Sequence, residues 1–253
     1  MAKRDEIIKF LNNYLEIDKW QDDYHNGLEV KGAGEVKKIA VGVTPSLGLF
    51  QKAKKAGAQM VITHHYLHLK KDPKHPVPIP NYELERVRFL KKNKISFANY
   101  HLPLDFHNEI GNEILTLKQF GFDIVSSKFY FQKGFYGGKL KKSTTLQAII
   151  KKGNKIYPDK PIVLKFGPKK ISSIAVITGS AHSFYEEARK AGARTFITGN
   201  LKVESPDVAR ELGLNIIAYG HHNTEKVGIE ALGKLVAEKF NIKQEFINIQ
   251  TSI

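Results

Sequence analysis

The chain has 253 residues, no cysteine and a formal net charge of +15. This length can bury a sizeable core in one large or two small domains. The lack of cysteine excludes disulfides and thiolate ligands, so any metal must be held by histidine, aspartate, glutamate or backbone. No stretch is apolar for long enough to span a membrane, and the N-terminus lacks the apolar core of a signal peptide, so we expect a cytoplasmic protein.

The elements predicted along the chain alternate between strands and helices. An amphipathic helix begins the chain, and Gly57 ends the helix that follows the first buried strand. In the first half, strands are predicted at 39–43, 59–63 and 96–100, and helices at 1–17, 49–56, 81–93 and 111–121. In the second half we predict a hairpin at 128–142, a helix at 144–152, a strand at 161–166 and a further βα series to the C-terminus. This alternation predicts an α/β fold with mainly parallel sheets.

The second βα series is a copy of the first. Residues 39–65 (IAVGVTPSLGLFQKAKKAGAQMVITHH) align without a gap with residues 174–200 (IAVITGSAHSFYEEARKAGARTFITGN). The match resumes where 96–105 lies over 216–225. We therefore expect two similar α/β lobes from an internal duplication, residues 1–125 and 126–253, with an approximate boundary at which the lobes can interlock.

Histidines follow three of the predicted strands. His64 and His65 follow one strand, His101 follows the next, and His221 and His222 follow the equivalent strand of the second copy. In open parallel sheets, functional groups gather beyond the carboxyl ends of the strands. Two of these histidines have a carboxylate four residues on, Asp105 after His101 and Glu225 after His221. We expect a metal cleft between the lobes, with ligands His64, His65, Asp105, His221 and Glu225.

Five nitrogen and oxygen ligands exceed what one four-coordinate zinc requires. Two divalent ions, bridged by a carboxylate, fit the set better, and adjacent histidines can then serve different ions. Zn, Mn, Fe and Ni all suit these ligands. A single buried histidine is more often an ordinary core residue, but three clusters at equivalent strand ends favour the metal site.

The remaining histidines give weaker signals. His68 and His75 lie in a long Pro- and Lys-rich loop and are expected to be solvated, unless the loop covers the cleft. His222 has the strand-end position without the acidic spacing, so at most it supports a ligand or faces a substrate. The turn at 178–180 (TGS) offers backbone donors to a phosphate, although a plain tight connection explains it better.

The motifs VITHH (61–65), YHLPLD (100–105) and YGHHNTE (219–225), with NGLEV (26–30), together form a pattern that resembles the Nif-three-like dinuclear-metal-centre hexameric family, the GTP cyclohydrolase type 2 homologues. The resemblance covers nearly the whole chain. It implies a two-lobed α/β subunit, a toroidal homohexamer built as a trimer of dimers, and two divalent ions per subunit. By motif position the family's ligands fall on the five residues named above, and a histidine close to the metal-bound water falls on His101. Tyr66 departs from the pattern, which usually has proline there.

Two functions remain open at this stage. The first is a dinuclear metal-dependent hydrolase that acts on a nucleotide or a related phosphorylated compound, with His101 as the catalytic proton-transfer residue. The second is a toroidal metal-binding protein that binds DNA non-specifically through a basic surface. The many lysines attract phosphates in either case, although a solvated lysine-rich surface explains them slightly better because no block is dense enough to form a tail.

Overall fold

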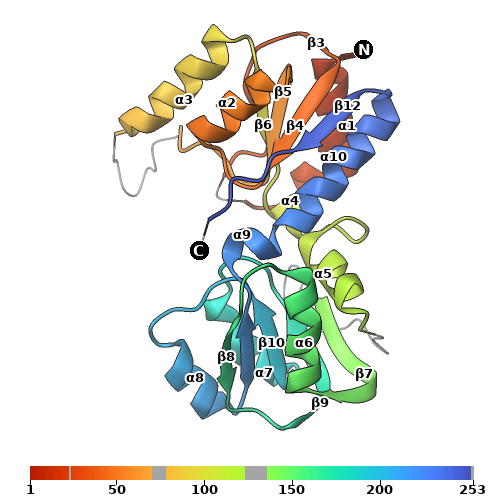
Figure 1. Cartoon of the computed structure of the whole chain (residues 1–253), viewed down its shortest axis with the longest axis vertical. Coiled ribbons are helices and arrows are strands. Elements are labelled where there is room, and N and C mark those ends of the chain that lie inside the picture. The colour runs from red at the N-terminus through yellow and green to blue at the C-terminus, as the bar shows by residue number, and fades with distance from the viewer. Residues whose placement is uncertain (23, 70–77, 123–135, 252–253) are drawn as a thin grey trace. The chain divides into compact units, whose positions relative to one another are not determined.

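The computed structural model describes residues 1–22, 24–69, 78–122 and 136–251. The chain forms two compact units, each built around one five-stranded sheet (Figure 1). The first unit holds residues 1–104 and 228–250, and the second holds residues 105–227 and Thr251. The expected α/β class, with two similar lobes and mainly parallel sheets, is confirmed.

The sheet of the first unit has the strand order β12, β4, β5, β6, β2. Its strands are β12 (Lys243–Phe246), β4 (Lys38–Gly42), β5 (Met60–Thr63), β6 (Ser96–Asn99) and β2 (Gly27–Val30). The first four are parallel, and β2 pairs antiparallel with β6. A small antiparallel pair, β1 (Ala2–Lys3) and β3 (Glu35–Val36), belongs to the same unit. The carboxyl ends of β5 and β6 therefore lie side by side at one edge of the sheet.

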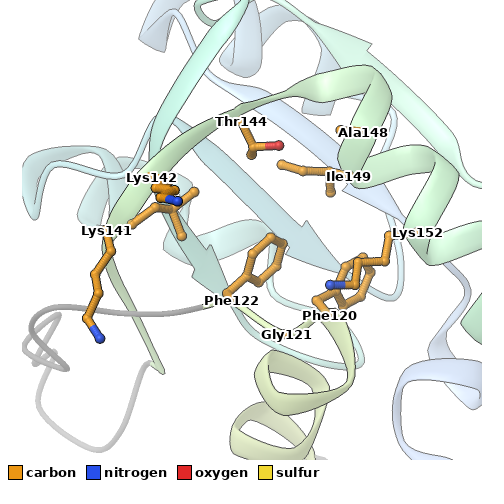
Figure 2. Close-up of a pocket in the computed structure, with 10 residues that line it drawn as sticks. Phe120, Gly121, Phe122, Lys141, Lys142, Thr144, Ala148, Ile149 and Lys152 are labelled. Atoms are coloured by element: carbon orange, nitrogen blue, oxygen red, sulfur yellow. The ribbon is translucent and has the colours of Figure 1, made fainter.

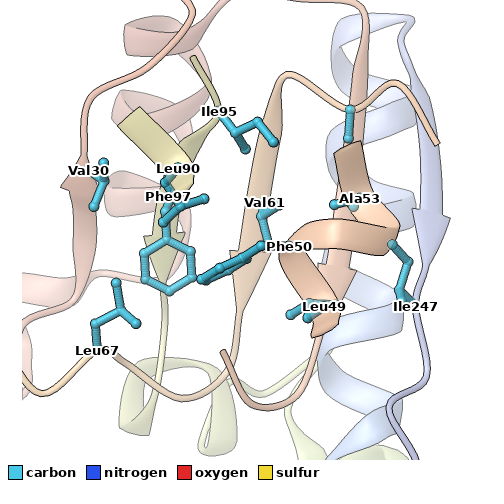
Figure 3. Close-up of a cluster of buried hydrophobic side chains, with 12 residues drawn as sticks. Val30, Leu49, Phe50, Ala53, Val61, Leu67, Leu90, Ile95, Phe97 and Ile247 are labelled. Carbon is cyan, nitrogen blue, oxygen red and sulfur yellow. The ribbon is translucent and has the colours of Figure 1, made fainter. Parts of the chain in front are cut away.

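Helices cover both faces of this sheet. On one face, α2 (Leu47–Lys55) and α3 (Asn81–Lys92) cover apolar side chains from β4, β5 and β6, and Phe50 packs edge-to-face on Phe97 at 5.5 Å between ring centroids (Figure 3). On the other face, Gly233 of α10 (Lys226–Phe240) approaches Val41 closely. Helix α1 (Arg4–Tyr14) lies beside α10 through the ring contact of Phe10 with Phe240. A sheet that is buried on both faces requires strands whose successive residues are nearly all apolar.

The second unit repeats this arrangement. Its sheet has the order β7 (Tyr136–Thr145), β9 (Lys170–Val176), β10 (Thr195–Thr198), β11 (Asn215–Ala218), β8 (Ile162–Lys165). The three central strands are parallel and the two edge strands antiparallel. Helices α7 (Tyr185–Lys190) and α8 (Ser205–Leu212) pack on one face, and α5 (Asn112–Phe120) and α6 (Leu146–Ile156) pack on the other. Counting both units, the short helices are η1 (Ile17–Lys19), α4 (Leu102–Asp105), η2 (His182–Phe184) and α9 (His221–Thr224).

The sheet register corrects one part of the expected alignment. Met60 pairs with Ser96 in the first sheet, and Thr195, the equivalent of Met60, pairs with Asn215 in the second. Residue 96 is therefore equivalent to 215, and the expected alignment of 96–105 with 216–225 is wrong by one residue. His101 is equivalent to Gly220, so the two histidines with a carboxylate four residues on are not copies of each other.

The first unit is completed by a segment from near the C-terminus. The chain leaves the first unit after Leu104 and returns to it at Gly228, so that α10 and β12 complete the first unit. This division differs from the expected one after residue 125, because β12 adds to the edge of the first sheet beside β4. Of the hairpin expected at 128–142, residues 128–135 lie outside the described residues, and the remainder lies in β7, which pairs antiparallel with β9. Among the described residues, no helix has both the length and the apolar character needed to cross a membrane.

Candidate metal centre

Three histidines gather at the carboxyl ends of β5 and β6 in the first unit. His64 and His65 follow β5 directly, and His101 follows β6 after Tyr100. One ring nitrogen of each lies within 4.8 Å of one from each of the other two. Their ring centroids are 4.9 to 6.0 Å apart. This cluster could hold a metal ion, as the position of the histidines after parallel strands predicts.

Neighbouring polar groups orient two of these rings. Nδ1 of His64, a fully buried residue, lies 3.1 Å from the carbonyl oxygen of Tyr100. A carbonyl only accepts hydrogen bonds, so Nδ1 carries the proton and Nε2 presents its lone pair. His65 Nδ1 lies 2.8 Å from the hydroxyl of Thr44. Each ring is therefore held through one of its own nitrogens, which is the usual arrangement of metal-binding histidines.

A buried carboxylate, which the sequence interpretation missed, holds the third histidine. Asp22 Oδ2 lies 3.2 Å from Nδ1 of His101, and the Asp22 side chain is only 3% exposed. The same carboxylate accepts hydrogen bonds from the Leu102 amide and from Asn26 Nδ2. Burial by itself raises the pKa of Asp22, but the hydrogen bond and charge of His101, with these further hydrogen bonds, hold it below its ordinary value. An ionised Asp22 fixes the orientation of the His101 ring through Nδ1.

Two acidic residues lie together in the second unit, near its start. Asp105 ends α4, is buried, and accepts a hydrogen bond of 2.8 Å from Asn112 Nδ2. Glu113, also buried, accepts hydrogen bonds from the amide and the hydroxyl of Thr178. Burial, together with the charge of Asp105, raises the pKa of Glu113 well above its ordinary value.

His221 and Glu225 meet at the carboxyl end of β11 in the same unit. His221 Nε2 lies 3.0 Å from Glu225 Oε1, and Glu225 is buried. On the other side of the ring, Nδ1 lies 3.1 Å from Asn200 Nδ2. Gly179 makes room for the pair: a Cβ built at this glycine would lie nearer than 3.0 Å to Glu225 Oε1 and 3.2 Å from His221 Nε2. Within the turn at 178–180, Gly179 thus leaves the space that the Glu225 carboxylate occupies.

All six residues predicted for the site are described, three in each unit. The first unit brings His64, His65 and His101 together, and the second brings His221 and Glu225 together. Asp105, which accepts a hydrogen bond from Asn112, brings a carboxylate oxygen within 4.8 Å of one from Glu225 in the same unit. The signal that could have found Asp22 is its place four residues before Asn26, in the segment that leads into β2.

Of the three weaker histidine candidates, the structure describes two. His222 is buried, His68 is exposed, and His75 lies outside the described residues. A pocket of about 510 Å³ in the second unit has Phe120 and Phe122 at its base and lysines at its rim (Figure 2). No expected ligand is among its lining residues, which are Phe120, Gly121, Phe122, Leu140, Lys141, Lys142, Thr144, Ala148, Ile149 and Lys152.

Known proteins resemble this chain both in sequence and in fold. Residues 2–253 match the family model described as Duf34/NIF3 (NGG1p interacting factor 3). The chain belongs to the Duf34/NIF3 family. Its relatives include a protein named GTP cyclohydrolase 1 type 2 homolog from Archaeoglobus fulgidus, 34% identical over 98% of both chains. A protein of the same name from Haemophilus influenzae is 33% identical over 96% of this chain and 97% of the relative.

Solved structures with the same fold agree with this assignment. The structure titled "protein ybgI, unknown function" superposes with a TM-score of 0.91, at 31% identity over the whole of both chains. The protein TTHA1606 from Thermus thermophilus gives a TM-score of 0.87 at 28% identity, also over the whole of both chains. The family resemblance carried by the strand-end motifs is therefore confirmed.

Proposed function

We propose that this Duf34/NIF3 protein is a dinuclear metal-dependent hydrolase that acts on a nucleotide or a related phosphorylated compound. The observation that carries the proposal is the cluster of His64, His65 and His101, whose ring nitrogens lie within 4.8 Å of one another. The proposed ligands are His64, His65, Asp105, His221 and Glu225.

The residues fit a pair of divalent ions. The donors are imidazole nitrogens held through their second nitrogen, together with buried carboxylates, a set that suits Zn, Mn, Fe or Ni. When bound, two such ions supply a hydroxide nucleophile near neutral pH and neutralise charge that develops on the substrate.

His101 is the proposed proton-transfer residue. Its Nδ1 is occupied by Asp22, which leaves Nε2 as the nitrogen that takes or gives a proton. The Asp22 carboxylate stabilises the imidazolium that forms when His101 accepts a proton. The name of the relatives, GTP cyclohydrolase 1 type 2 homolog, and the net charge of +15 support an anionic nucleotide as substrate.

The test combines metal content with turnover. Purified protein is stripped of metal and reloaded with Zn, Mn, Fe or Ni in turn, and product release is then measured for a panel of nucleotides that includes GTP. Asp105→Asn removes one proposed ligand. Asp207→Asn is the matched control, because its exposed carboxylate pairs only with Arg210 among the ion pairs found in the described part of the chain.

We expect two ions per chain, and turnover that is lost in Asp105→Asn and kept in Asp207→Asn. Equal turnover in both variants, or no stoichiometric metal, would refute the proposal. The alternative is a metal-binding ring that binds DNA non-specifically through its basic surface. It predicts DNA binding that weakens steeply with salt and persists in Asp105→Asn.

We also propose that the protein assembles as a homohexamer, a trimer of dimers with the shape of a toroid. The support is the family membership and the likeness to related chains over their whole length. Light scattering would then give a mass about six times that of the 28.6 kDa chain. A monomeric mass across the working concentration range would contradict this.

A further inference from the structure

Two aromatic side chains stand beside His101 in the first unit, a third packs against them, and the proposed mechanism uses none of the three. Tyr24 and Tyr66 stack with ring centroids 3.5 Å apart and planes 16° from parallel. His68 meets Tyr66 edge-to-face at 4.8 Å. We call Tyr24, Tyr66 and His68 the aromatic wall. Its two tyrosines come from different segments, because Tyr66 directly follows His65 whereas Tyr24 lies before β2.

The aromatic wall is fixed relative to His101. The His101 ring stands nearly perpendicular to both tyrosine rings, at 6.0 Å from Tyr24 and 6.1 Å from Tyr66. Asp22, which holds His101, also accepts a hydrogen bond of 3.2 Å from the Tyr24 amide. One carboxylate therefore positions both the proposed proton-transfer residue and one ring of the wall.

Packing between the two tyrosines does not explain the whole arrangement. In a stack of two rings each ring covers one face of the other, and Tyr24 remains 41% exposed. An aromatic face left in water next to a polar site is a platform on which a planar ring can stack, and every nucleobase has such a face. A phosphate-only ligand would gain nothing from this wall.

We infer that the aromatic wall binds the planar heteroaromatic ring of the substrate, stacked on Tyr24 beside His101. This deepens the proposed function, since it names the part of a nucleotide that the first unit recognises. Stacking tolerates any base, so the wall selects for the presence of a ring and discriminates little between guanine and adenine.

The experiment measures binding to metal-free and metal-loaded full-length protein by calorimetry. GMP and AMP carry a ring, and ribose 5-phosphate is the probe without one. Tyr24→Leu and Tyr66→Leu remove the aromatic faces, and Tyr24→Phe keeps one. Tyr82→Leu is the matched control, because Tyr82 is a 53% exposed tyrosine in α3 of the same unit, with Arg86 over its ring. A thermal melt confirms that each variant is folded.

We expect Tyr24→Leu to weaken GMP and AMP binding by about tenfold or more, because a base loses its stacking partner. Tyr24→Phe and Tyr82→Leu should stay within about twofold of the parent protein, and ribose 5-phosphate should bind all the proteins alike. The inference is overturned if GMP binds no better than ribose 5-phosphate, if no nucleotide binds, or if Tyr24→Leu changes nothing while it remains folded.

Turnover separates this inference from the proposed function. Hydrolysis that depends on Asp105 but not on Tyr24 supports the hydrolase and refutes a role of the aromatic wall in substrate binding. Ring binding that depends on Tyr24, without hydrolysis, supports the aromatic wall as a binding site and refutes the hydrolase.

Discussion

Replacing Gly179 with alanine tests whether Glu225 is held in place for a metal. Gly179 has a φ of +62°, and a Cβ there would lie nearer than 3.0 Å to Glu225 Oε1. Two effects follow. The positive φ costs an L-residue about 1–2 kcal/mol. The new methyl group also pushes the carboxylate away by about 1 Å, since non-bonded atoms need roughly 3.5 Å.

The expected loss of metal follows from this displacement. Metal–ligand distances tolerate about 0.2 Å, so a carboxylate moved by about 1 Å no longer reaches its ion in the same geometry. Changes to groups that merely orient a ligand already lower metal affinity about 10- to 100-fold. We therefore expect Gly179→Ala to bind metal at least tenfold more weakly, as measured by competition with a chromogenic chelator.

Gly57→Ala is the matched control. Gly57 has a φ of +75°, and nothing lies within 4 Å of a Cβ built there. Both variants should thus lose about 1–2 kcal/mol of unfolding free energy to backbone strain, and only Gly179→Ala should lose metal. If Gly179→Ala binds metal as tightly as the parent protein, the role assigned to Glu225 is refuted. If both variants lose metal affinity equally, backbone strain alone explains the loss.

Three further predictions concern stability. Gly153→Ala in α6 should destabilise the protein by about 1–3 kcal/mol in urea, because its methyl group would overlap the buried Tyr219. By contrast, Gly48→Ala in α2 should stabilise by up to ~1 kcal/mol, because a Cβ there would meet Ser46 Oγ at an ordinary contact distance of 3.9 Å. Ser46→Ala removes the cap that accepts the Leu49 amide at 3.1 Å, and should lower the free energy of unfolding by about 1 kcal/mol in the same assay. Adding a chelator to metal-loaded protein should lower its Tm by roughly 5–10 °C, because the ions bind only the folded state.

The strand ends that carry the histidines were predictable because each signal is local. The strand that ends at Thr63 is apolar up to that residue, and the histidines follow at once, so both the strand and the histidines at its end can be read in a few residues. The gap-free repeat also placed β4 and β5 over their equivalents β9 and β10, in the same order within each sheet.

Other features depend on contacts between distant parts of the chain, which no local pattern carries. Strand β12 pairs with β4 from about 200 residues away, so the return of the C-terminus to the first unit had no signal of its own. The one-residue error in the repeat arose because residues 96–105 and 216–225 match weakly, and only the pairing with β5 and β10 fixes their register. Asp22 was missed since its partner, His101, lies 79 residues away.

The corrected alignment also explains why the two copies carry different residues at equivalent strand ends. Gly199 and Asn200 of the second copy occupy the positions of His64 and His65. A Cβ at Gly199 would lie 2.7 Å from the Cα of His221, so a histidine there would force His221 away. Asn200 instead contacts Nδ1 of His221. In the second copy, the residue equivalent to His64 leaves room for His221, and the residue equivalent to His65 contacts its ring. The first copy has no histidine at the position of His221.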